Sequence, residues 1–173
     1  MSDTASAAPL ARPAITLAPL PRDQIGRVDH FTLPPDQAPF SAHPRDVMDA
    51  PDTRDGHVIL ADGQPAGFFA IDRDYPDHHD FAPEGTIGLR MFSVDHAQQG
   101  RGVASNGCRA LAGYLAAQYP RAGSCYLTVN CRNADAYRVY IKGGFVDTGA
   151  LYLGGGFGPQ HIMCLDLKHP PAG

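Results

Sequence analysis

A glycine-containing loop lies where a strand-like segment gives way to a helix-like one, and its residue types suit an anionic ligand. Backbone N–H groups in the first turn of a helix are unsatisfied donors at the positive end of the helix dipole. Glycine lets a ligand come close to them because it carries no Cβ. The stretch therefore predicts a pyrophosphate cradle, with a turn that merely starts a helix as the alternative. It consists of Gln99, Gly100, Arg101, Gly102, Val103, Ala104 and Ser105.

Two common phosphate-binding motifs do not fit this loop. A P-loop requires the pattern Gly-x-x-x-x-Gly-Lys-[Ser/Thr], and the loop contains no lysine. A dinucleotide fingerprint requires a third glycine where Ser105 stands, and it belongs to alternating βαβ units, whereas the local pattern here is antiparallel. Nucleotide hydrolysis and dinucleotide binding are therefore disfavoured.

A second motif follows about thirty residues later in the stretch LTVNCRNADAYRVYIKGGF, in which Asn133 opens a helix that carries Tyr140 and ends at Gly144-Phe145. Together with the pattern Gln99-x-x-Gly102-x-Ala104, it resembles the GNAT superfamily of acetyl-CoA-dependent N-acyltransferases. The resemblance covers residues 15–167 and is strongest over 88–145. Softer features resemble the small-amine branch, which includes spermidine and diamine acetyltransferases.

The resemblance implies a fold and a binding site. The fold is a GNAT-like α+β domain, with a mixed, mostly antiparallel sheet that is flanked by helices and splayed between its fourth and fifth strands. Backbone groups of the fourth strand would bind the pantetheine arm of acetyl-CoA, and the glycine loop would hold the pyrophosphate. Asn133 either contacts that arm or only caps its helix. The fourth-strand residues are Phe92, Ser93 and Val94.

The resemblance also assigns the chemistry. Tyr140 would protonate the leaving thiolate, because a phenol with a pKa of about 10 is protonated at neutral pH and can donate to a thiolate with a pKa near 8.5. Tyr137 is expected to pack in the core. Many relatives place a basic carboxylate near the fourth strand. Here Glu84 precedes that strand and is the first candidate, while Arg90 in its middle serves an ion pair or grips a substrate carboxylate. The other candidates for the base are Asp80, Asp95 and His96.

The acceptor predicted from the sequence is a polyamine or another small primary amine. An acidic segment precedes the fourth strand and would attract polycations; a solvated acidic loop is the alternative. Amino-acid, aminoglycoside or protein N-terminal acetylation, and a non-catalytic acetyl-CoA-binding module, remain open. No metal is expected, and the resemblance leaves open a homodimer through the last two strands. The acidic residues are Asp72, Asp74, Asp77, Asp80 and Glu84.

Hydrophobic periodicity predicts the elements that position these residues. Helices are expected over 104–119 and 133–142, with short helical pieces at 22–31 and 44–50 and a polar loop at 72–85. Asp62-Gly63 is a hairpin turn pair. The glycine-rich segment 154–158 is predicted to be a flexible hairpin loop, an open candidate for a lid over the acceptor. Strands are expected over 15–20, 57–61, 66–71, 86–94, 124–130, 145–153 and 161–167.

Composition limits the class of protein. The chain has 173 residues, 43% of them hydrophobic, and a net charge of −4, which disfavours a nucleic-acid partner. It has no apolar run long enough to span a membrane and no signal-peptide pattern. We expect a cytoplasmic, bacterial protein with one domain over 14–168 and tails at 1–13 and 169–173. The four cysteines are expected to be buried free thiols.

Overall fold

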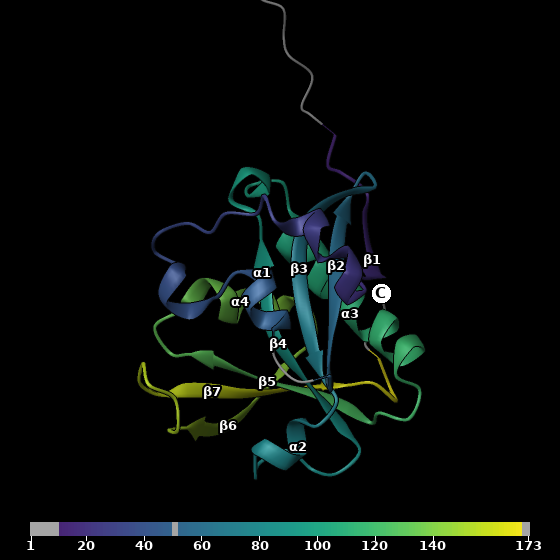
Figure 1. The fold of residues 1–173 in the computed structure, drawn as a ribbon. Coiled ribbons are helices and arrows are strands. Elements are labelled where there is room, and N and C mark those ends of the chain that lie inside the picture. Colours follow the sequence, from purple (N-terminus) through teal and green to yellow (C-terminus); the bar gives the residue numbers. More distant parts are fainter. Residues whose placement is uncertain (1–10, 50–51, 171–173) are drawn as a thin grey trace, which may run out of the picture.

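A seven-stranded sheet runs through the molecule, and helices cover both of its faces (Figure 1). The computed structural model of the protein describes residues 11–49 and 52–170. The strands follow the spatial order β1-β2-β3-β4-β5-β7-β6. Their bounds are β1 Ile15–Pro19, β2 Arg54–Ala61, β3 Gln64–Asp72, β4 Thr86–Val94, β5 Ser124–Asn130, β6 Val146–Tyr152 and β7 Gln160–Asp166.

One neighbouring pair of strands breaks the antiparallel pattern, and this pair is also the shortest. β4 and β5 run parallel and pair only from Thr86, opposite Ser124, to Gly88, opposite Tyr126. The other neighbouring strands are all antiparallel. Beyond Gly88 the two strands diverge. The predicted α+β class, the mostly antiparallel mixed sheet and the splay between the fourth and fifth strands are therefore confirmed.

Each face of the sheet has its own apolar core, because successive side chains of a strand point to opposite faces. Ile59 and Phe69 belong to the core under α3, on what we call the α3 face, which α4 also covers. Val58 and Phe68 belong to the core under η1 and α1, on the α1 face. The helices are η1 Arg22–Val28, η2 Ala38–Phe40, α1 Pro44–Met48, α2 Tyr75–His78, η3 His96–Gln98, α3 Val103–Gln118 and α4 Ala134–Lys142.

Two predictions from the sequence need correction. The segment predicted to be a polar loop contains the short helix α2, in which Pro76 fits the first turn and the side chain of Tyr75 is only 2% exposed. The prediction that all four cysteines are buried is wrong for Cys131, which is exposed in the turn after β5, and for Cys164, which is half-buried.

The predicted tails lie at the two ends of the chain, and the predicted dimer involves the edge of the sheet. Residues 1–10 and 171–173 of the tails lie outside the described part of the chain. No helix formed by residues 11–49 and 52–170 is long and apolar enough to cross a membrane. β6 ends the sheet beyond β7 and exposes Val146 and Leu151. An edge strand offers backbone groups to another strand, and the homodimer through the last strands stays a prediction.

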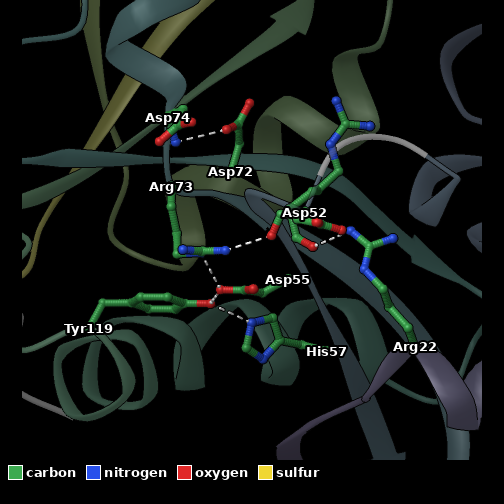
Figure 2. Close-up of polar contacts among 9 residues, drawn as sticks. Arg22, Asp52, Asp55, His57, Asp72, Arg73, Asp74 and Tyr119 are labelled. Carbon is green, nitrogen blue, oxygen red and sulfur yellow. Dashed lines mark hydrogen bonds and ion pairs between the residues drawn. The ribbon is translucent and has the colours of Figure 1, made fainter.

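A buried polar network ties the end of α3 to the sheet (Figure 2). His57 of β2 is 3% exposed and stacks on Phe69, with ring centroids 4.9 Å apart. Tyr119 donates to Asp55 Oδ2 at 2.8 Å, and its oxygen therefore accepts from His57 Nε2 at 2.9 Å. The hydroxyl of Tyr114 donates to His57 Nδ1 at 2.7 Å. Both ring nitrogens are thereby satisfied in the neutral form.

This network predicts a stability that depends on pH. Burial lowers the pKa of His57 from 6.5 to about 4, against the smaller opposing effect of Asp55. Below pH 6.5 the unfolded chain takes up a proton that the folded protein takes up only below about pH 4, so stability is lost as the pH falls through this window. We expect a loss of about 2 kcal/mol between pH 7 and pH 4.5 from this group.

Urea unfolding of the wild type and of His57→Gln at the two pH values measures this contribution. The difference between the two pH values should shrink by that amount in His57→Gln. The exposed His30, changed to Gln, is the matched control and should behave like the wild type. An unchanged pH dependence in His57→Gln would contradict the assignment.

Candidate active site

A cavity of about 880 Å³ lies at the divergence of β4 and β5. Its walls include residues 89–94 of β4, residues 128–130 of β5 and the inner side of α4. Val103 and Tyr140 reach it from the α3 face, and Val47 and Met91 reach it from the α1 face. The cavity therefore lies within the splay itself, with wall residues from both faces of the sheet.

A β-bulge at Met91 shapes the β4 wall. Phe69 of β3 pairs with Phe92 and Ala70 pairs with Arg90, so Met91 is an extra residue, and its φ is +54°. Its sulfur accepts hydrogen bonds from Ser41 Oγ at 3.0 Å and from Ala42 N at 3.2 Å. The bulge shifts the alternation of side chains by one residue. Ile87 and Leu89 face α3 before it, and Phe92 and Val94 do so after it.

The glycine loop forms one end of the cavity. Gly100 and Gly102 both have a φ of +78°, a conformation that strains any residue with a Cβ. Gly102 is the N-cap of α3, and no side chain caps this terminus. The first free backbone N–H groups of the helix therefore lie at the cavity wall. The predicted loop residues that line the cavity are Gln99, Gly100, Gly102, Val103, Ala104 and Ser105.

The remaining member of the predicted loop has a different environment. Arg101 is exposed, donates to the side chain of Gln98 and does not belong to the cavity lining. Its guanidinium therefore lies on the outer rim of the loop. The predicted contact of Arg101 with the ligand has no support in this geometry.

Tyr140 lies in the middle of the cavity wall, on α4. Its half-buried ring packs against Phe92 and Phe145, with centroids 6.1 and 5.6 Å apart. Burial raises the pKa of the Tyr140 hydroxyl, which keeps it protonated at neutral pH. This hydroxyl has no hydrogen-bond partner within the described part of the chain. A donor with no protein acceptor is available to a ligand.

The two other residues that the sequence analysis places on α4 have clear structural roles. Asn133 is the N-cap, since its Oδ1 accepts from Ala136 N at 3.3 Å, and it also lines the cavity. Both roles predicted for Asn133 are therefore geometrically compatible. Tyr137 donates to Asp147 Oδ2 at 3.0 Å and stays outside the cavity lining, in line with the packing role predicted for it.

The α1-face end of the cavity is lined by charged and aromatic side chains. Arg54 and Arg90 reach it from β2 and β4, and the ring of Tyr75 reaches it from α2. Arg90 Nε donates to Asp72 Oδ2 at 2.7 Å, and the Asp72 side chain is only 5% exposed. The guanidinium of Arg90 also lies 5.2 Å from the centroid of the Tyr75 ring. The ion pair predicted as one role of Arg90 is present.

His79 completes this end of the cavity as a neutral ring. Arg90 Nη2 lies 3.4 Å from His79 Nε2, and because a guanidinium can only donate, Nε2 is the acceptor. Burial, and next the charge of Arg90, lower the pKa of His79. The Nδ1 atom is buried without a partner among the described residues. The neutral ring therefore packs beside Arg90 and adds no second charge.

The four residues considered as the base do not reach the cavity. Glu84, Asp80 and His96 are exposed and stand outside its lining. Asp95 is buried at 4% exposure, but its Oδ1 accepts from Thr32 N at 3.0 Å and holds a loop in place. The predicted role of Glu84 as base therefore has no support in the geometry. Sequence analysis missed Arg54, Tyr75, His79 and Tyr152 as cavity residues, because no local motif marks them.

Comparison with known proteins now decides the family. Residues 26–145 match the model of the acetyltransferase (GNAT) family. The chain belongs to this family. The predicted family and the predicted acyltransferase class are confirmed.

Individual relatives of this GNAT protein agree with that result. YbbJ, described as an uncharacterized N-acetyltransferase of Bacillus subtilis strain 168, is 26% identical over 136 residues, which are 76% of this chain and 85% of that protein. The structure of AAC(6')-Ib with paromomycin and acetyl-CoA has a TM-score of 0.69 at 16% identity, covering 90% of this chain and 94% of that chain. A mutant of the spermidine N-acetyltransferase SpeG from Vibrio cholerae has a TM-score of 0.63 at 15% identity, covering 89% and 94%. At these identities the structures share the fold.

The unpartnered hydroxyl of Tyr140 predicts that removing it is harmless to folding. Tyr140→Phe should leave the free energy of unfolding within about 0.5 kcal/mol of the wild type, because no buried hydrogen bond is lost. Tyr119→Phe is the matched comparison and should lose about 1–2 kcal/mol, since its hydroxyl joins His57 to Asp55. Urea unfolding at pH 7 measures both, and equal losses would contradict this reading.

Proposed function

We propose that the protein is an N-acetyltransferase that moves the acetyl group of acetyl-CoA to a primary amine by direct attack in a ternary complex. The observation that carries the proposal is the cavity within the splay of the sheet, with the glycine loop at one end and Tyr140 in its wall. Family membership and the acetyl-CoA complex of a structural relative support it.

Acetyl-CoA would enter from the side of the glycine loop. Free N–H groups at the start of α3 suit the pyrophosphate, because each can donate a hydrogen bond and the helix dipole favours negative charge. The part of β4 beyond Gly88 has no β5 partner, so its backbone groups can pair with the amides of the pantetheine arm. Phe92, Ser93 and Val94 are the residues in this position.

The reaction needs a proton to leave the ammonium before attack, and two further transfers during acetyl transfer. The lone pair of the amine attacks the thioester carbonyl carbon, the C–S bond breaks, and the proton of the Tyr140 hydroxyl passes to the leaving sulfur. The attacking nitrogen, which is positively charged after the attack, gives a proton to the tyrosinate, so that the amide forms and the Tyr140 hydroxyl is restored. Loss of a proton from an alkylammonium at neutral pH costs roughly 4–5 kcal/mol. None of the four residues predicted as candidates for the base lines the cavity; they are Asp80, Glu84, Asp95 and His96. We propose that the ammonium proton leaves through solvent before the attack.

The acceptor assignment is more restricted than the sequence alone suggests. Asp74, Asp77, Asp80 and Glu84 stand outside the described lining of the cavity, and Asp72 is paired with Arg90. The acidic segment therefore offers no anionic pocket for a polycation. This geometry favours a small primary amine without several positive charges over a polyamine or an aminoglycoside.

Tyr140→Phe tests the chemical role of the hydroxyl. We expect kcat to fall at least about 100-fold, the size typical of a lost general acid, while the Kd for acetyl-CoA stays within twofold. Thiol release from acetyl-CoA measures the rate, and titration calorimetry measures the Kd. Tyr137→Phe is the matched control and should retain its rate, because Tyr137 lies outside the cavity lining. Full turnover in Tyr140→Phe would refute the role of this residue.

Gly102→Ala tests the cradle. A Cβ at a φ of +78° strains the backbone by about 1 kcal/mol and displaces the N–H groups at the start of α3. We expect the Kd for acetyl-CoA to rise tenfold or more in calorimetry. Gly113→Ala, in the exposed middle of the same helix with open space around its Cβ, should leave the Kd unchanged. Equal affinities of the two variants would argue against pyrophosphate binding at this terminus.

A further inference from the structure

The α1-face end of the cavity holds more positive than negative charge. Arg54 and Arg90 both line it, and the carboxylate of Asp72 lies between them, behind the lining. Among the described residues that line the cavity, Asp135 has the single carboxylate, and this carboxylate lies in the first turn of α4 and is paired with Arg138. The two guanidinium groups therefore share one counter-charge.

Strand register produces this arrangement. Arg54 of β2 lies opposite Asp72 of β3, and Arg90 of β4 lies opposite Ala70, two residues earlier on β3. Residues two apart on a strand face the same way. Ala70 belongs to the α1-face core, so Asp72 and its two arginine neighbours lie on that face. Arg54 and Arg90 thus converge on one end of the cavity from separate strands.

Several donors at this end remain available to a ligand. Arg90 uses Nε for Asp72 and directs Nη2 toward His79, a long contact of 3.4 Å. Arg54 uses Nη1 for the carbonyl of Val47 at 3.1 Å. A guanidinium has five N–H donors in a planar fork that matches the two oxygens of a carboxylate. Burial and the nearby charge of Arg90 lower the pKa of Arg54, as expected where positive charge is undercompensated.

The acceptor that fits these groups carries a carboxylate as well as an amine. Arg90 lies two residues before Phe92 on β4, where the acetyl group would be held, and two residues of chain span at most about 7 Å. A carboxylate on the carbon next to the amine can therefore reach the arginines while the amine faces the thioester. The rings of Tyr75 and Tyr152 line the same end and suit an apolar side chain.

We infer that the acceptor is an α-amino acid with an apolar or aromatic side chain, whose carboxylate is bound by Arg54 and Arg90. This inference rests on the proposed function and names the substrate class of the same site. Spermidine lacks the carboxylate and would bring further positive charge to this end of the cavity. A peptide N-terminus presents an amide in place of the carboxylate, and an amide cannot pair with two guanidinium groups in the same way.

Matched acceptors test the inference in the thiol-release assay. Phenylalanine, phenylalanine amide and phenethylamine share one ring and one amine and differ in the carboxylate, and spermidine is the fourth acceptor. Rates are expressed per concentration of unprotonated amine, so that differences in the fraction of each amine that is protonated cancel. We expect kcat/KM for phenylalanine to exceed that of each other acceptor at least tenfold. A preference for phenethylamine, the amide or spermidine overturns the inference.

Two variants test the arginines directly. Arg90→Lys and Arg54→Lys keep the positive charge, including the pairing with buried Asp72, and remove the planar fork. Each should lower kcat/KM for phenylalanine at least tenfold, mainly through KM, and leave the value for phenethylamine within twofold. Arg27→Lys, on the exposed surface of η1, is the matched control and should leave both values unchanged. Equal losses on both acceptors would show a merely structural role and overturn the inference.

The acceptor panel and calorimetry together distinguish a failure of this inference from a failure of the proposed function. Turnover of amines that lack a carboxylate, without turnover of phenylalanine, overturns the inference and upholds the acetyltransferase. Failure of acetyl-CoA to bind in calorimetry overturns the proposed function. If acetyl-CoA binds and no acceptor is turned over, calorimetry of phenylalanine with the coenzyme A complex decides: binding that Arg90→Lys weakens tenfold supports the inference, and no binding overturns it.

Discussion

The end of pairing between β4 and β5 at Gly88 is the constraint on which the site depends. Two parallel strands that diverge leave backbone donors and acceptors without strand partners, and such groups are costly to bury unless something else satisfies them. Gly88 itself lies under the ring of Tyr75, where a Cβ would stand 1.9 Å from a ring carbon. The buried tyrosine therefore packs over the last paired residue of β4.

The bulge at Met91 complements this divergence. It lets the strand turn and shifts the alternation of its side chains. Arg90 and Met91 therefore lie on the α1 face, while Phe92 packs against Tyr140. The sulfur of Met91 accepts hydrogen bonds from Ser41 and Ala42, which lie just before α1 in the chain. One irregular residue thus gives β4 a wall for each of the two ligands, and helices packed on opposite faces close the two ends.

The acidic and basic side chains near the cavity differ in burial, and this difference decides which of them can act on a ligand. Asp77, Asp80 and Glu84 are exposed, so solvent screens their charges, whereas Arg54 and Arg90 line a cavity where their charges are screened less. The buried His57 on the α3 face shows the opposite solution, in which a titratable ring is kept neutral by two tyrosine hydroxyls, that of Tyr114 and that of Tyr119, the second of which Figure 2 shows. The protein separates this structural cluster, whose imidazole is uncharged, from the two arginines that face the cavity.

The local motifs were readable from the sequence because they depend on neighbouring residues. The glycine loop before α3 and the cap at Asn133 follow from neighbouring residues in a turn or a helix. The family resemblance, and the choice of Tyr140 that it implies, also rest on such short motifs. The tertiary structure alone decided which distant residues share the cavity. Strand pairing and the bulge set the direction of each side chain, and they bring Arg54 and Arg90 together while Glu84 stays outside. A register is a long-range property, so no local pattern around these residues could reveal it.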